Sequence, residues 1–280
     1  RRPPIYTLLP YTTLFRSVIG HVFREEKKPV SQTPVLDKPN SPISNSYVSI
    51  RTKLNLLTKA KEHPVIAVTS ALPNEGKTFN AINIASSIAL TRKTVALLDL
   101  DVRNSKVAEA FDLGKAKGVV NYIIGKASIE DITNNTKLSW LKVIPAGPIP
   151  PNPAEMLTDL RLKRLVEKLK EIYDVVIIDT PPVGFVSDIF QLGDMIDANI
   201  FVVRHKSTPK QALKMILDEI GRHQMKGMGI IINDIRQKKG KHGYGYGYGY
   251  GYGYGYDQKK SNGTREILSI KDVIESGGNT

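Results

Sequence analysis

The sequence predicts a three-layer α/β fold, in which helices cover both faces of a mainly parallel central sheet. Three observations lead to this prediction. Short, continuously apolar segments recur along the chain, as in strands that are buried on both faces. Segments with helical spacing of apolar residues alternate with them, as in repeated strand–helix units. The chain has 280 residues and is 41% hydrophobic, which is enough for one large domain of about 200 residues with flexible ends.

The apolar segments give the expected elements in chain order. Strands are expected at residues 65–69, 94–98, 141–145, 175–178, 199–203 and 229–232. Helices are expected at residues 47–57, 77–90, 162–173 and 208–220. In the third helix, six apolar side chains follow at spacings of three or one, which places them on one side. They are Leu162, Leu165, Val166, Leu169, Ile172 and Tyr173.

Composition divides the chain into four parts. Residues 1–17 lack a clear periodicity and resemble a translated leader of foreign origin. Residues 18–44 are rich in charge and proline and are expected to form a linker. The folded domain is expected at 45–236, followed by a flexible tail at 237–280 in which a short helix could form near the end.

Bulk properties exclude several classes of function. The chain contains no cysteine, which excludes disulfides, zinc–thiolate sites and a thiol nucleophile. No apolar run reaches the roughly 18 residues that are needed to cross a bilayer. The net charge of +13 suits nucleic acid, an anionic membrane face or phosphorylated partners. No nucleic-acid motif accompanies this charge, so we expect no nucleic-acid partner.

The first motif with chemical content is Ala-Leu-Pro-Asn-Glu-Gly-Lys-Thr at residues 71–78. It follows a strand and opens a helix, which is the context of a P-loop, the phosphate-binding turn of P-loop NTPases. Lys77 is expected to reach the β- and γ-phosphates of ATP, and the Thr78 hydroxyl to bind Mg²⁺. The backbone of the turn is expected to surround the phosphates through Pro73, Asn74, Glu75 and Gly76.

The second motif places Asp99, Asp101 and Arg103 at the end of a buried strand. Alternation along a strand points both carboxylates to the same side. Such a pair can hold Mg²⁺ or accept a proton from an attacking hydroxyl, with Asp99 as the first choice of acceptor and Asp101 as the second. Arg103 is expected to stabilise charge on the transferred phosphoryl group.

The third motif is the apolar strand at 175–178 followed by Asp179-Thr180-Pro181-Pro182, which is typical of a Walker B strand. Its aspartate, Asp179, is expected to hold the water shell of the metal, so that Thr78, Asp101 and Asp179 form the expected metal site. Asn233 ends the last strand, where either a contact to the adenine edge or a simple strand-end cap fits its side chain.

The C-terminal region contains tyrosines that alternate with glycine over residues 243–256. Glycine offers no side chain to a core, so the phenols are expected to be exposed on a flexible segment. Phosphorylation of all seven would add about −10 to −14 charges and nearly neutralise the chain. A disordered low-complexity segment without phosphorylation is the alternative. The tyrosines are Tyr244, Tyr246, Tyr248, Tyr250, Tyr252, Tyr254 and Tyr256.

Together the three motifs and the tail resemble the bacterial tyrosine kinases that control capsule and exopolysaccharide export. Residues 147–157 also resemble a segment of that family, and the likeness covers about residues 18–256. The resemblance implies a kinase on the cytoplasmic face of the bacterial membrane that transfers phosphate from MgATP to its own tyrosine cluster in trans. It further implies association into a ring, a membrane polysaccharide co-polymerase or activator that is separate or fused upstream, and a cognate phosphatase.

The chain departs from the family pattern at two places. The ring-forming helix of the family carries Glu-x-x-Arg-x-x-Arg, whereas the matching positions here are Asn45, Val48 and Arg51. Ring assembly through this motif is therefore in question. Phe79 follows Thr78 at a position where a hydroxyl residue is common, and we expect a difference in packing there.

Two other functions remain as alternatives. A partition or septum-positioning ATPase shares the P-loop branch, but that group carries a lysine second in the P-loop, where this chain has Leu72. A scaffold that only senses nucleotide and binds partners through the tail is the other alternative. Phosphotyrosine formation with MgATP separates the kinase from both.

Overall fold

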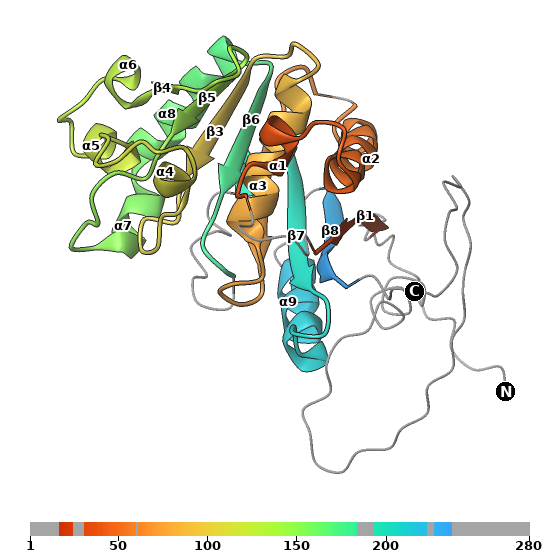
Figure 1. The fold of residues 1–280 in the computed structure, drawn as a ribbon. Coiled ribbons are helices and arrows are strands. Elements are labelled where there is room, and N and C mark those ends of the chain that lie inside the picture. Colours follow the sequence, from red (N-terminus) through yellow and green to blue (C-terminus); the bar gives the residue numbers. More distant parts are fainter. Residues whose placement is uncertain (1–16, 25–30, 60, 184–192, 223–226, 237–280) are drawn as a thin grey trace, which may run out of the picture.

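An eight-stranded sheet forms the centre of the computed structural model, which describes residues 17–24, 31–59, 61–183, 193–222 and 227–236 (Figure 1). The strand order is β1-β8-β7-β2-β6-β3-β5-β4, and every pairing is parallel except that of β4 with β5. The strands are β1 (Ser17–Phe23), β2 (Val65–Ser70), β3 (Val95–Asp99), β4 (Asn134–Asn135), β5 (Leu141–Ile144), β6 (Val175–Asp179), β7 (Ala198–Arg204) and β8 (Met228–Ile235).

Helices cover both faces of this sheet, which confirms the predicted fold class. They are α1 (Pro34–Asp37), α2 (Pro42–Leu57), α3 (Lys77–Ala89), α4 (Val107–Ala110), α5 (Val119–Ile123), α6 (Ile129–Ile132), α7 (Pro153–Thr158), α8 (Leu160–Ile172) and α9 (Lys210–Arg222). In the described part of the chain no helix has the length and apolar character of a membrane span.

Alternate side chains of each central strand enter different cores. In β2, Ile66 and Val68 pack with residues of α1, α2 and α3, while Val65 and Ala67 pack with residues of α5 and α8. This division follows from the two-residue repeat of a strand. Both sets of side chains are apolar, because each face of the sheet is covered. Because β2, β3 and β6 are parallel neighbours, their carboxyl ends meet at one edge of the sheet, where the three motifs lie.

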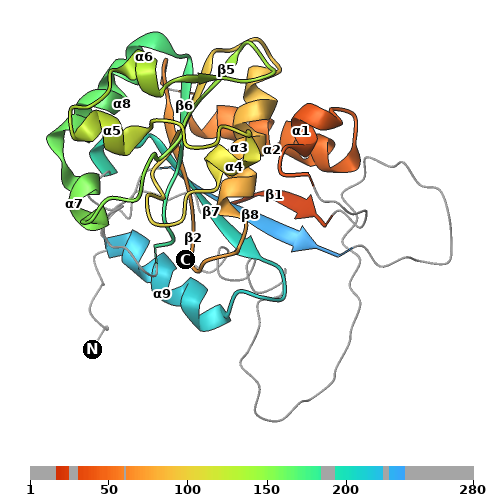
Figure 2. The same ribbon diagram turned by 60° about the vertical axis from the view of Figure 1, so that its left-hand side comes forward.

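The segment before the expected domain is part of the sheet, so the prediction of a linker at 18–44 is wrong for the residues described there. β1 pairs with β8 at one edge of the sheet, as both views show (Figures 1 and 2), and its Ile19 and Val22 are buried. A Cβ atom at Gly20 would lie 2.2 Å from Ile50 Cγ1, so glycine allows α2 to pack closely on β1. Two register irregularities in β1 also obscure its strand pattern.

Helix α2 begins earlier than the apolar pattern indicates. Ser41 caps it by accepting a hydrogen bond from the Ser44 amide, and Pro42 occupies its first turn. The short elements α1, α4, α5, α6, α7 and β4 were not expected from periodicity, because none is longer than six residues. The predicted leader lies almost wholly, and the predicted tail wholly, outside the described residues.

Candidate active site

The P-loop joins the end of β2 to the first turn of α3, as the sequence predicts. Asn74 and Gly76 both have positive φ angles, of 64° and 96°, which give the loop its tight turn. A Cβ atom at Gly76 would lie 2.1 Å from Asn233 Nδ2, so only glycine fits this position. The Asn233 amide donates to the Glu75 carbonyl over 2.9 Å. Asn233 therefore holds the loop through this hydrogen bond.

The Glu75 side chain holds the P-loop in place through two hydrogen bonds. Its carboxylate accepts hydrogen bonds from the Leu72 amide over 2.9 Å and from the Thr208 hydroxyl. The side chain is buried, and this burial raises the pKa of Glu75. Sequence reasoning assigned only the backbone of Glu75 to phosphate binding. Its bond to Thr208, 133 residues away along the chain, carries no local sequence signal.

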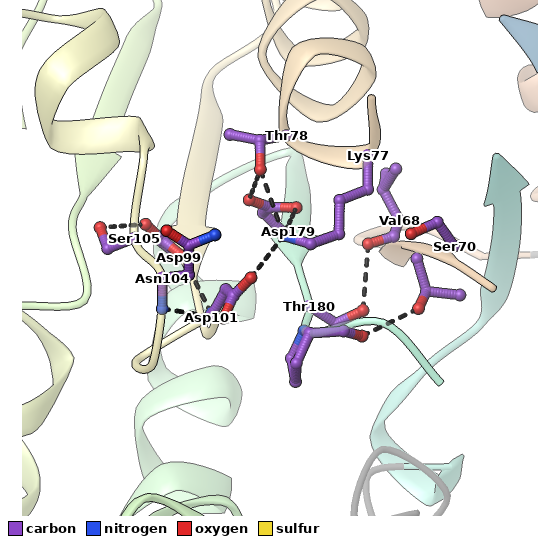
Figure 3. A network of polar contacts seen from close by, with 12 residues as sticks. Val68, Ser70, Lys77, Thr78, Asp99, Asp101, Asn104, Ser105, Asp179 and Thr180 are labelled. Carbon is purple, nitrogen blue, oxygen red and sulfur yellow. Dashed lines mark hydrogen bonds and ion pairs between the residues drawn. The ribbon is translucent and has the colours of Figure 1, made fainter. Parts of the chain in front are cut away.

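Lys77 lies between two carboxylates at the head of α3 (Figure 3). Its Nζ is 2.7 Å from Asp101 Oδ2 and 3.4 Å from Asp179 Oδ1. Burial disfavours the charged ammonium, but the two carboxylates outweigh burial and hold the pKa of Lys77 above its ordinary value. The ammonium is therefore charged at neutral pH, as phosphate binding requires.

The Asp99 side chain is fully buried near Lys77 and is not exposed to solvent in the site. Its carboxylate accepts hydrogen bonds from the Ser105 hydroxyl over 2.6 Å and from the Asp101 amide over 2.9 Å. Burial and the nearby Asp179 carboxylate, which is its register partner on β6, raise the pKa of Asp99 to about 7. Asp99 thus fixes the loop that carries Asp101, a relation visible in Figure 3.

The Thr78 hydroxyl donates to Asp179 Oδ2 over 2.6 Å, which places two oxygen groups side by side next to the P-loop (Figure 3). The described residues contain no group of three or more acidic or histidine side chains that could enclose a metal ion alone. Mg²⁺ does not need such a group, because it keeps several waters and uses one or two protein oxygens together with phosphate. Thr78 and Asp179 fit this role, and Asp101, the third residue of the expected metal site, lies closer to Lys77 than Asp179 does.

A cavity of about 350 Å³ lies beside the P-loop. Asp101, Arg103, Lys77 and Thr78 line it, whereas Asp99, Asp179 and Asn233 do not. The structure thus brings most predicted site residues together and places Asp101, but not Asp99, in the lining of the cavity. The full lining is Gln32, Pro73, Asn74, Gly76, Lys77, Thr78, Phe79, Asp101, Arg103, Asn104, Lys106, Pro181 and Pro182.

Comparison with known proteins agrees with this geometry. Residues 64–226 match the family described as AAA domain. Tyrosine-protein kinase CpsD of Streptococcus agalactiae serotype III is 33% identical over 198 residues, which cover 70% of this chain and 84% of that protein. Tyrosine-protein kinase YwqD of Bacillus subtilis is 34% identical over 207 residues, covering 74% and 86%. The chain belongs to the bacterial tyrosine-protein kinases. It is an enzyme of the P-loop type that binds nucleotide.

Solved kinase domains share the fold of this kinase. The kinase domain of Escherichia coli tyrosine kinase ETK aligns with a TM-score of 0.73 and 26% identity, covering 83% of this chain and 95% of that domain. The BceF tyrosine kinase domain gives a TM-score of 0.68 with 29% identity, covering 80% and 95%. Other relatives are longer: the chain covers 32% of tyrosine-protein kinase ptk of Acinetobacter johnsonii, at 31% identity.

The altered ring-motif positions lie on α2. Arg51, the one residue kept, donates from Nη1 to the Ser87 carbonyl over 2.5 Å and to the Ser87 hydroxyl over 3.2 Å. This arginine therefore ties α2 to α3 within the chain. Val48 is 42% exposed on the same helix. The ring of Phe79, which follows Thr78, contacts Tyr47 of α2.

Proposed function

We propose that this kinase transfers the γ-phosphoryl group of MgATP to the tyrosines of its own C-terminal cluster, Tyr244 to Tyr256, and that one subunit modifies another. The observation that supports this proposal most is the position of the Lys77 ammonium, which lies 2.7 Å from Asp101 at the head of the P-loop helix. A fixed cation and a carboxylate at one edge of a cavity are what phosphoryl transfer to a hydroxyl requires.

In the proposed reaction, the tyrosine oxygen attacks the γ-phosphorus, and the bond between this phosphorus and the β,γ-bridging oxygen breaks, so that ADP leaves. The P-loop amides and Lys77 hold the phosphates and balance the charge that develops on them. Mg²⁺, held through Thr78 and through water on Asp179, would neutralise further charge on the phosphates. Arg103 borders the same cavity and is proposed to contact the transferred group.

The phenolic proton must go to a carboxylate. A tyrosine hydroxyl has a pKa near 10, so its proton leaves late in the transfer. Sequence reasoning preferred Asp99, but this side chain is fully buried and does not line the cavity. Asp101 does line it. We therefore assign Asp101 as the proton acceptor and Asp99 as the residue that positions it.

The wider setting follows from the family resemblance. We propose that tail phosphorylation regulates synthesis and export of a capsule or exopolysaccharide, at the cytoplasmic face of the membrane. There the chain would associate with further copies of itself. Its other partners would be a membrane co-polymerase, either separate or fused upstream, and a cognate phosphatase. Both arrangements agree with the relatives, because the chain covers 84% of CpsD but 32% of ptk.

Complementation between two variant chains tests the reaction, because one chain lacks the active-site lysine and the other lacks the acceptor tyrosines. One chain carries Lys77→Met and an intact tail, and the other has an intact site and all seven tail tyrosines changed to phenylalanine. With MgATP, neither chain alone should gain phosphotyrosine, whereas the mixture should label the Lys77→Met chain. Mass spectrometry then locates the label.

Label outside the cluster would refute the tail as the phosphate acceptor. If the wild-type chain becomes labelled but the mixture of the two variants does not, transfer in trans is refuted. Phosphate release without labelling of wild type would indicate an ATPase.

A further inference from the structure

Part of the cavity lining, here called the apolar wall, consists of apolar side chains, although the groups that handle phosphate are charged. Phe79, Pro181 and Pro182 line it. Neither an apolar ring nor two prolines can bind phosphate, Mg²⁺ or a proton. They can only contact another apolar surface. The question is which part of the reactants presents such a surface beside Lys77 and Asp101.

The ring of Phe79 is held from behind. It packs against Tyr47 in an edge-to-face arrangement, with 6.3 Å between the ring centroids and 63° between the planes. Tyr47 is fully buried, and its hydroxyl donates to Asn80 Oδ1 over 3.1 Å. A side chain backed by a fixed aromatic residue has little freedom to turn away. The Phe79 ring is therefore a rigid part of the cavity wall.

The two prolines are fixed as well. The Thr180 hydroxyl donates to the Val68 carbonyl, and the Thr69 hydroxyl donates to the Pro181 carbonyl, both over 3.0 Å. These bonds fasten the segment after β6 to the end of β2, as Figure 3 shows for Thr180 and Val68. Proline rings add no rotatable side chain. Phe79 and the segment that carries the two prolines are thus each held in place.

Charged side chains also line the same cavity. Arg103 and Lys106 line it and are exposed. The cavity therefore brings together apolar side chains, the carboxylate of Asp101 and these two cations.

We propose that Phe79, Pro181 and Pro182 form the docking surface for the aromatic ring of the acceptor tyrosine. This inference rests on the proposed kinase reaction and names its acceptor subsite. The ring lies against the wall, its hydroxyl faces Asp101, and the glycines on either side let the backbone approach closely. Arg103 and Lys106 favour a tail in which neighbouring tyrosines already carry phosphate, because each phosphate adds negative charge beside them.

Steady-state kinetics on the full chain tests the docking surface. A synthetic Gly-Tyr repeat peptide serves as acceptor, in a chain whose own tail tyrosines are changed to alanine, so that no tethered ring competes for the surface. Phe79→Leu keeps an apolar side chain but removes the ring, so the KM for the peptide should rise about two- to tenfold, as expected for loss of an aromatic contact. The KM for ATP should stay unchanged. Phe79→Tyr, which keeps the ring, should retain the low peptide KM.

Direct binding supplies a measurement that does not depend on turnover. A Gly-Phe repeat peptide keeps the rings and lacks the hydroxyls, so it should bind in the presence of a non-hydrolysable ATP analogue and bind more weakly to the Phe79→Leu chain. Phe111→Leu is the matched control, because Phe111 packs against the same core without lining the cavity. Circular dichroism establishes that each variant is folded.

The outcomes separate this inference from the proposed function. If wild type labels its tail but Phe79→Leu leaves the affinity for both peptides unchanged, the docking surface is refuted and the kinase reaction stands. If Phe79→Leu raises the KM for ATP instead, the wall contacts the nucleotide, and the inference is again refuted. If wild type forms no phosphotyrosine at all, the proposed function itself fails.

Discussion

Arg204 at the end of β7 pairs with Asp234 on β8, with 2.8 Å between Nε and Oδ2. The same arginine donates from Nη1 to the Asn74 carbonyl in the P-loop over 3.1 Å. On its other side, Asp234 accepts two hydrogen bonds from Arg24, just after β1. The edge strand β1 and the phosphate-binding turn are therefore joined through one carboxylate, although 50 residues separate Arg24 from Asn74.

This linkage predicts a double effect for Asp234→Asn. Loss of the charge weakens both arginine contacts, so the P-loop loses a tether and the KM for ATP should rise. The side chains of Arg24 and Arg204 are 36% and 35% exposed. Because solvent screens these contacts, the expected loss of unfolding free energy is about 1 kcal/mol. Urea denaturation and nucleotide titration measure the two effects. Glu109→Gln, at an exposed carboxylate on α4, is the control and should change neither.

The stabilisation from Asp234 should depend on pH in one direction. Partial burial opposes ionisation, but the hydrogen bonds from Arg24 and Arg204 outweigh it and lower the pKa of Asp234 below its ordinary value of 3.8. A lowered folded-state pKa gives stability that is present above the unfolded pKa and is lost as the pH falls through the folded one. The difference in unfolding free energy between wild type and Asp234→Asn should therefore be constant near about pH 5 and shrink below about pH 4. A difference that grows on acidification would contradict this assignment.

The two aspartates of the second motif should differ in their effect on catalysis. Asp101→Asn removes the carboxylate that lines the cavity, so kcat should fall by about 100-fold or more, as for loss of a general base. Asp99→Asn keeps one oxygen that can accept from the Asp101 amide but replaces the other, which accepts from Ser105, by a donor, so its loss should be smaller, about tenfold. Tail labelling at saturating ATP measures both rates. A larger loss for Asp99→Asn would restore Asp99 as the proton acceptor.

Local patterns predicted the elements that carry the site. The strands β2, β3 and β6 are continuous apolar runs, and each ends in a motif whose chemistry is written in consecutive residues. The parallel arrangement then brings Lys77, Asp101 and Asp179 to one edge, which periodicity alone implies. This is why the fold and the P-loop could be predicted without a template.

Long-range contacts were beyond the same reasoning. Nothing near Asp234 in the sequence indicates that Arg24 will pair with it, 210 residues away. Strand β1 was hidden because Gly20 and His21 interrupt its apolar pattern, and its glycine is explained only by the Ile50 side chain of α2. The preference for Asp99 over Asp101 could not take burial into account for a similar reason, since burial depends on where β3 ends and not on alternation.

Gly76→Ala should abolish nucleotide binding. Its φ of 96° is strained for alanine, and the added Cβ would lie 2.1 Å from Asn233 Nδ2. The double variant with Asn233→Ala separates the two causes, because it removes the steric contact but leaves the backbone strain. Binding that returns fully in the double variant would show that φ is unimportant here; we expect only partial return. Titration with a fluorescent ATP analogue provides the measurement.

Lys77→Met should cost stability as well as activity. Transfer to the tail should fall by about 100-fold or more, because the phosphates lose their fixed cation. The buried carboxylates of Asp101 and Asp179 also lose the ammonium that balances them. Removing one partner of a buried ion pair costs about 3 to 5 kcal/mol. Lys106→Met, which removes an exposed cation from the same cavity, should leave the unfolding free energy unchanged. Urea denaturation without nucleotide compares the two variants, and equal stability of Lys77→Met and wild type would mean that Lys77 serves the phosphates alone.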